Sequence, residues 1–243
     1  MKSIHVPRVN ARYWTAITLA SVFGTNLGDL YAHESGLSIG TGLAVLVVVS
    51  VFAMLAERRD FAKHEAWYWL VIIIVRTGAT NIADFLAFRV RVPPIALGLG
   101  LVILLAVLGL ATHRVESKED AAAALHSPPK TTVIYWSAML TAGVLGTVLG
   151  DDASHLLGEG RASIGLGALL MVSLLLRRGS VRVMTYWAVL AIARTAGTAI
   201  GDFLAENKQL GIGLPLSTLI TGLTLIAILA AWRAQARATT SHQ

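Results

Sequence analysis

Long apolar segments separated by short polar ones run along the whole chain, and none shows the alternation of a β-strand. A helix of about 20 apolar residues is long enough to cross the hydrocarbon core of a bilayer. The pattern therefore predicts an all-α integral membrane protein with eight transmembrane helices. The predicted spans are Tyr13–Tyr31, Leu37–Leu55, Trp67–Phe88, Ile95–Ala111, Val133–Leu157, Ser163–Leu176, Met184–Ala205 and Leu210–Trp232.

One motif occurs four times and groups these spans into pairs. Each copy begins with Tyr-Trp, continues with apolar residues and ends with Thr-x-x-x-Asp, and the copies align without a gap at 13–29, 68–84, 135–151 and 186–202. An even number of spans in each repeat makes every copy point in the same direction. We therefore expect four parallel two-helix repeats in two pseudo-symmetric halves, 1–114 and 133–243, joined by a cytoplasmic linker at 115–132.

Composition and charge agree with this interpretation. The chain is 55% hydrophobic and 14% charged, which is too apolar for a soluble domain of 243 residues. Most of its 20 Lys and Arg residues lie at one set of predicted helix ends, so the positive-inside rule puts both termini and the Tyr-Trp pairs at the cytoplasmic interface. The net charge of +6 then reflects topology and not nucleic-acid binding. Because the chain contains no Cys, disulfides and thiol chemistry are excluded.

Each copy carries a Thr and an Asp four residues apart, on one face of its helix and at the same expected depth. Ionisable residues inside a membrane are costly and usually mark a functional site. Small-xxx-small pairs next to them predict that the four odd-numbered helices pack closely, with the polar residues around a cavity open to the outside. The predicted ion-binding residues are Asp29, Asp84, Asp151, Asp202, Thr25, Thr80, Thr147 and Thr198.

The copies differ in a way that adds candidate metal ligands. In the first and third copies a His follows the Asp by four residues, at His33 and His155. Carboxylate and imidazole ligands suit Mn²⁺ or Zn²⁺, so Asp29, His33, Asp151 and His155 are candidate ligands. Alternatively, each His lies at the outer interface and only hydrogen-bonds its own Asp.

The second and fourth copies carry an Arg four residues before the Thr, at Arg76 and Arg194. Each could form a structural ion pair with an Asp of a neighbouring helix, release that Asp when a cation arrives, or bind an anionic substrate. Because two Arg face four Asp, the net acidic interior favours a cation. Asn26 and Asn81 occur in the first half only, and either join helices by hydrogen bonds or make the site asymmetric.

Three further acidic residues lie close to the repeated motif. Asp152 is turned about 100° from the face of Asp151, and Glu34 and Glu159 fall in predicted turns. We expect all three to be solvated.

The repeated Tyr-Trp…Gly-Thr-x-x-Gly-Asp segment resembles a family of bacterial membrane proteins made of four tandem units called a repeat of unknown function. Units of that family have two spans and a characteristic Trp, and the resemblance covers nearly the whole chain. The residues that fall on this position are Trp14, Trp69, Trp136 and Trp187. The resemblance implies this architecture and a location in the bacterial inner membrane.

The function expected from these patterns is transport or export of an inorganic cation, with a divalent metal ion as substrate and no cofactor. The expected partners are the lipid bilayer, the ion and a possible second copy of the chain. The alternatives are a carrier of anions or organic acids that uses the two Arg, and a scaffold or sensor that transports nothing. No phosphate-binding loop, nucleophile elbow or HExxH motif is present, so we do not expect an enzyme.

Overall fold

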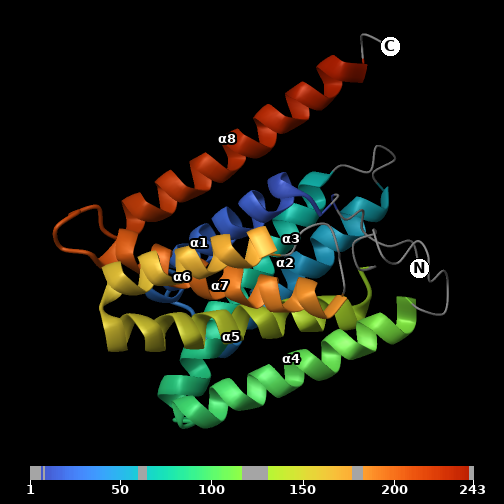
Figure 1. Ribbon diagram of the computed structural model, residues 1–243. Coiled ribbons are helices and arrows are strands. Elements are labelled where there is room, and N and C mark those ends of the chain that lie inside the picture. The colour runs from blue at the N-terminus through green and yellow to red at the C-terminus, as the bar shows by residue number, and fades with distance from the viewer. Residues whose placement is uncertain (1–6, 8, 60–64, 117–130, 177–182, 241–243) are drawn as a thin grey trace.

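The computed structural model describes the chain except residues 1–6, 8, 60–64, 117–130, 177–182 and 241–243 (Figure 1). The predicted linker at 115–132 falls largely outside the described residues. Within the described part the chain forms eight α-helices and one π-helical segment, and no strand. They are α1 (Ala11–Glu34), α2 (Ile39–Arg59), α3 (Glu65–Asp84), η1 (Phe85–Arg89), α4 (Pro94–Glu116), α5 (Val133–Leu157), α6 (Glu159–Leu176), α7 (Val183–Glu206) and α8 (Leu214–Thr240).

The all-helical prediction is confirmed, and seven of the eight helices in the described residues are long and apolar enough to cross a membrane. The exception is α1, because small and polar residues make up a larger share of its sequence; Ser21, Thr25 and Asn26 are all buried in it. These helices indicate a multi-pass membrane protein.

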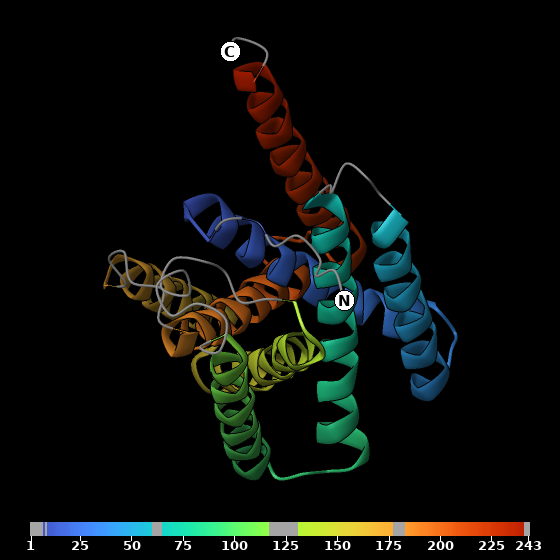
Figure 2. The same cartoon turned by 90° about the vertical axis from the view of Figure 1, so that its right-hand side faces the viewer.

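Helices α1, α3, α5 and α7 form a central ring in which each packs against the next, and α7 packs against α1 to close the ring. The other four helices lie outside the ring: α2 packs on α3, α4 on α5, α6 on α7 and α8 on α1. In Figure 2 the outer helices lie on four different sides of the central group. The ring is therefore complete within one chain, and α8 covers α1, next to the point where the ring closes.

Capping residues position the aromatic pairs of two central helices. The Asn10 side chain accepts a hydrogen bond from the backbone N–H of Tyr13 at 3.1 Å, and the Thr132 hydroxyl accepts one from the N–H of Tyr135 at 3.2 Å. Each cap satisfies a backbone donor that the first helical turn leaves free. Both Tyr residues therefore have the same register from their helix starts.

Small residues allow the central helices to approach closely, as predicted. An added Cβ at Gly28 would lie 2.8 Å from the Thr80 Cβ of α3, and one at Gly150 would lie 2.6 Å from the Thr198 Cβ of α7. These distances are shorter than real Cβ contacts, so side chains larger than hydrogen do not fit without separating the helices. The close packing brings the polar faces of the four helices together.

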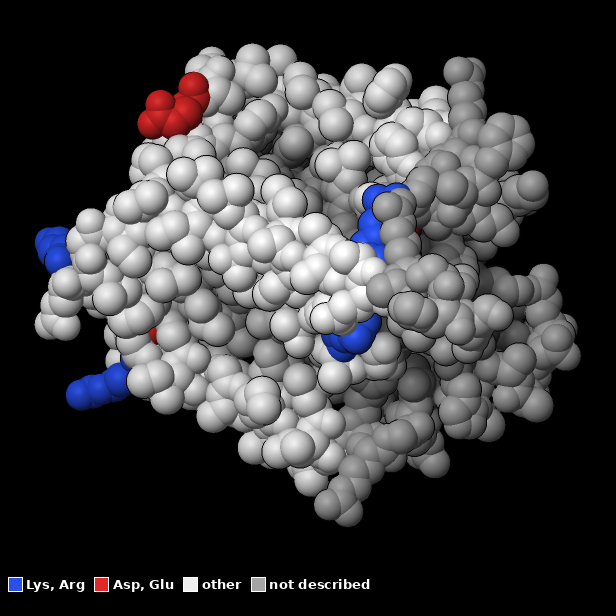
Figure 3. All heavy atoms as spheres, turned by 90° about the horizontal axis from the view of Figure 1, so that it is seen from above, with Lys and Arg blue, Asp and Glu red and all other residues white. Residues whose placement is uncertain are grey.

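The outer helices present large apolar side chains to their surroundings. Phe52 of α2, Ile95 of α4 and Ile164 of α6 are each more than 70% exposed. Few of the described side chains on the face shown in Figure 3 are charged. Such a surface suits contact with lipid.

Most side chains of the Tyr-Trp pairs are buried inside the protein, which the sequence did not predict, whereas their expected depth at the cytoplasmic interface stays a prediction. All four Tyr of the repeated motif are buried, as are Trp14, Trp69 and Trp187, and they belong to the hydrophobic core. The tyrosines point toward the axis of the ring, where their hydroxyls hydrogen-bond to one another. Burial is therefore possible without leaving the hydroxyls unsatisfied.

Candidate functional site

Side chains four residues apart face the axis on each central helix. Four residues advance an α-helix by about 6 Å and turn it about 40° beyond a full turn, so such a row stays on one side of the helix. Across the four helices these rows form successive layers, which we name by their residues. They are the Tyr layer (Tyr13, Tyr68, Tyr135, Tyr186), the apolar layer (Ile17, Ile72, Met139, Leu190), the Arg layer (Ser21, Arg76, Gly143, Arg194), the Thr layer (Thr25, Thr80, Thr147, Thr198), the Asp layer (Asp29, Asp84, Asp151, Asp202) and the rim layer (His33, Phe88, His155, Glu206).

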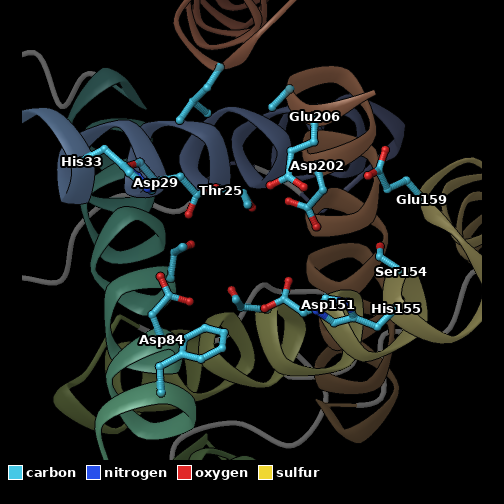
Figure 4. Close-up of a pocket in the computed structure, with 15 residues that line it drawn as sticks. Thr25, Asp29, His33, Asp84, Asp151, Ser154, His155, Glu159, Asp202 and Glu206 are labelled. Carbon is cyan, nitrogen blue, oxygen red and sulfur yellow. The ribbon is translucent and has the colours of Figure 1, made fainter. Parts of the chain in front are cut away.

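The Thr, Asp and rim layers surround a cavity of about 620 Å³. Asp29, Asp84, Asp151 and Asp202 come from the four central helices and point into one central space (Figure 4). Thr25, Thr80 and Thr147 line the cavity below them. The carboxylates predicted from the sequence are thus brought together in one cavity, each half-buried.

One guanidinium closes the inner end of this cavity. The Arg76 side chain is fully buried and donates hydrogen bonds to the hydroxyls of the whole Thr layer. Its Nη1 reaches Thr80 at 3.1 Å and Thr147 at 2.8 Å, and its Nη2 reaches Thr25 at 2.5 Å and Thr198 at 2.6 Å. Arg76 therefore connects all four central helices directly beneath the Asp layer.

Arg194 has the equivalent position in α7 but different partners. It is also fully buried, and it donates to the Ser21 hydroxyl at 3.1 Å and to the Met139 sulfur at 3.4 Å. Its guanidinium therefore reaches the apolar layer, whereas that of Arg76 reaches the Thr layer. Two like charges at one level of a narrow axis repel each other, which favours opposite directions.

Two residues explain which Arg points toward the Tyr layer. Ser21 and Met139 are the partners of Arg194, and the equivalent positions across the ring hold Gly143 and Ile17, which offer neither a hydroxyl nor a sulfur. Among the described residues neither guanidinium forms an ion pair with an Asp. The interhelical ion pair, one of the interpretations of the sequence, is therefore absent from the described residues.

The two histidines of the predicted metal site lie in the rim layer. The His33 ring is exposed, and its Nδ1 lies 2.7 Å from the backbone carbonyl oxygen of Asp29. His155 lines the same cavity and is also exposed. In the part of the chain that the structure describes, no three His, Asp or Glu side chains stand close enough to hold a metal ion. Asp29, His33, Asp151 and His155 therefore share a cavity but do not form a preformed ligand set.

Asn26 and Asn81 join helices and do not line the cavity. The Asn26 amide donates to the Ser217 hydroxyl of α8 at 2.6 Å, and the Asn81 amide donates to the Gly28 carbonyl of α1 at 3.2 Å. Of the two roles that the sequence allowed, these contacts match helix–helix hydrogen bonding.

The sequence interpretation missed several lining residues. Phe88 and Glu206 occupy the rim layer in the second and fourth repeats, where the other repeats have His. Extending the alignment of the repeats by one helical turn would have identified both. Glu159, expected to be solvated in a turn, is the first residue of α6 and lines the cavity, whereas Asp152 does not line it.

Two parts of the chain match a known family model. The model of the family described as Repeat of Unknown Function (DUF347) matches residues 12–58 and 185–238. The first region covers α1 and α2 and the second covers α7 and most of α8, which are the first and last predicted repeats. This match agrees with the resemblance found in the sequence. No curated protein and no solved structure matches the chain.

Proposed function

We propose that the protein is a membrane transporter that binds an inorganic cation at the Asp layer. The leading candidate for this cation is a divalent metal ion. The observation that carries the proposal is the convergence of four carboxylates, one from each central helix, on one cavity. Glu159 and Glu206 add negative charge to the lining, and among the described residues the nearest positive charge is Arg76, beneath the Thr hydroxyls at the inner end. An acidic cavity with low-dielectric walls concentrates cations.

The width of the cavity bears on how the ion is bound. Since no three acidic or His side chains among the described residues stand close enough to hold a metal ion, the ion keeps part of its water shell. The volume of about 620 Å³ is large compared with the share of about 30 Å³ that one water takes in the liquid. Mg²⁺ and similar hard ions commonly bind in this way, through a few carboxylates and several waters.

The proposed location is the bacterial inner membrane, with both termini in the cytoplasm. Its support is the positive-inside bias of the Lys and Arg residues and the seven helices of spanning length and apolarity in the described part of the chain. Arg12 near the start of α1 hydrogen-bonds Gln235 near the end of α8 at 3.2 Å, so these helix ends lie at the same end of the bundle. The cavity is complete within one chain, so the proposed transport unit needs no second copy.

A thermal-shift screen of divalent cations on the purified protein tests the proposal. We expect one or two metals to raise the unfolding temperature, because a ligand at 100 times its Kd stabilises the folded state by about 2.7 kcal/mol. The Asp29→Asn/Asp151→Asn variant should lose this shift. Asp152→Asn removes a neighbouring carboxylate outside the cavity and should keep it. A metal shift that survives in the double variant would contradict binding at the Asp layer.

A carrier of anions or organic acids is the second candidate. It is favoured by the two fully buried guanidiniums, whose hydrogen bonds go to hydroxyls, one carbonyl and one sulfur. A buried charge without an opposite partner is costly and is a reasonable binding group for an anion. The same screen with small organic anions separates the two candidates, since only this one predicts a shift that depends on Arg76.

A further inference from the structure

The end of the axis opposite the cavity is closed by a ring of hydroxyl groups. The Tyr13 hydroxyl lies 2.9 Å from that of Tyr68 and 2.6 Å from that of Tyr186. Tyr135 completes the ring at 2.8 Å from Tyr68 and 3.3 Å from Tyr186. Each hydroxyl therefore has two neighbours, and the four side chains are buried.

Tryptophans surround this hydroxyl ring. Each Tyr ring lies against the Trp of the next central helix, and the same contact recurs in all four repeats. The ring-centroid distances are 5.8 Å for Tyr13–Trp69, 6.0 Å for Tyr68–Trp136, 5.6 Å for Tyr135–Trp187 and 5.8 Å for Tyr186–Trp14. Aromatic pairs at these distances attract one another beyond their burial alone, so they hold the Tyr layer together.

Behind the Tyr layer lies the apolar layer, whose four side chains are all 0% exposed. Met139 of this layer contacts the guanidinium of Arg194. A cation in the cavity would next meet two guanidiniums, then aliphatic side chains and then the hydroxyl ring. Narrow apolar constrictions block ions because water and ions leave them.

We propose that the Tyr and apolar layers form the inner gate of the cation path, with the four Tyr hydroxyls holding it closed. The proposal rests on the proposed transport function. Hydrogen bonds between neutral hydroxyls are individually weak, so the ring can open and close again. The cavity is open on the Asp side while this end is shut, which corresponds to one of the two states that alternating access requires.

Cysteine labelling tests the gate directly, because the natural chain contains no Cys. Ile17→Cys places a thiol in the apolar layer, and His155→Cys places one at the exposed rim of the cavity. The reagent is a cationic, membrane-impermeant methanethiosulfonate, added to either side of reconstituted vesicles. We expect His155→Cys to react from the Asp side only and Ile17→Cys to be unreactive from both sides.

Removing a hydroxyl from the ring should then open the gate. Added to Ile17→Cys, Tyr13→Phe should raise the labelling rate from the Tyr side at least tenfold. Tyr135→Phe removes hydrogen bonds of 2.8 and 3.3 Å, a longer pair than that of Tyr13, so it should raise the rate less, and it serves if Tyr13→Phe does not fold. Tyr31→Phe is the matched control, because its hydroxyl bonds the Gly42 carbonyl away from the axis and its loss should change nothing.

Two results would overturn the gate. One is an unchanged labelling rate in folded Tyr13→Phe and Tyr135→Phe proteins, which would leave the Tyr layer a purely structural element. The other is labelling of Ile17→Cys from the Asp side in the unmodified background. Labelling requires no bound metal, so the gate result is independent of the metal screen. If the Tyr variants open the gate but the Asp29→Asn/Asp151→Asn variant still binds metal, only the proposed cation site would be refuted.

Discussion

Replacing Arg76 by Gln should tighten binding of the cation and abolish its transport. The Arg76 guanidinium reaches the Thr layer, one layer, or about 6 Å, beneath the carboxylates that are proposed to bind the ion. A unit positive charge and a divalent ion at that distance repel each other by about 6 kcal/mol at an effective dielectric constant near 20, and by about 1.4 kcal/mol in bulk water. The repulsion in a cavity that contains water lies between these two values. We therefore expect the affinity to rise at least tenfold when this positive charge is removed.

Transport should fail for a different reason. Arg76 is the group that connects the hydroxyls of all four central helices, and it is also the nearest positive charge that can displace a bound cation. Without it, the ion is held more tightly and the Thr layer loses its central donor. Metal titration by calorimetry measures the affinity, and uptake into reconstituted vesicles measures the transport.

The control is Arg194→Gln, which removes the same charge from the equivalent position of α7. Because that guanidinium reaches Ser21 in the Arg layer and Met139 in the apolar layer, farther from the carboxylates, its loss should change metal affinity much less than the loss of Arg76. Equal effects of the two variants on metal affinity would contradict this asymmetry. If Arg76→Gln instead removed binding of an organic anion and left metal affinity unchanged, the anion carrier would be the correct function.

Replacing Gly146 by Ala should strongly destabilise the protein, although the change adds only one methyl group. An added Cβ would lie 2.8 Å from the backbone carbonyl carbon of Arg194 and 3.0 Å from the backbone nitrogen of Thr195, and would also overlap the Arg194 Cβ. Backbone atoms of a packed helix cannot rotate away, so α5 and α7 must separate. Overpacking of this kind costs about 1–3 kcal/mol and occasionally more.

Gly167→Ala in α6 is the matched control, because nothing lies within 4 Å of the added methyl group. Ala is the better helix former by about 0.5–1 kcal/mol, so this variant should be slightly stabilised. Thermal unfolding in detergent, followed by Trp fluorescence and size-exclusion chromatography, measures both. A Gly146→Ala protein with an unchanged unfolding temperature would show that the central helices are packed less closely than the structure indicates.

The sequence predicted the helices and the faces they bury because both depend on local periodicity. Thr147 and Asp151 are four residues apart, which is enough to put them on one face of α5 whatever surrounds that helix. The apolar content likewise predicted membrane-spanning helices, and seven of the eight helices in the described residues have the required length and composition. The small residues near Asp151 predicted the close approach that Gly146 and Gly150 make to α7.

Side-chain direction and contacts across the axis were decided only by the tertiary structure. Arg76 and Arg194 occupy equivalent positions in the repeats, yet they point to opposite ends because their partners on the facing helices differ and their charges repel. The repeated Tyr-Trp pair did not reveal that the four Tyr meet on one axis, where they satisfy one another's hydroxyls and can be buried inside the protein. Helical periodicity determines which face a residue occupies, whereas the partner of a long or polar side chain depends on helices that are distant in the sequence.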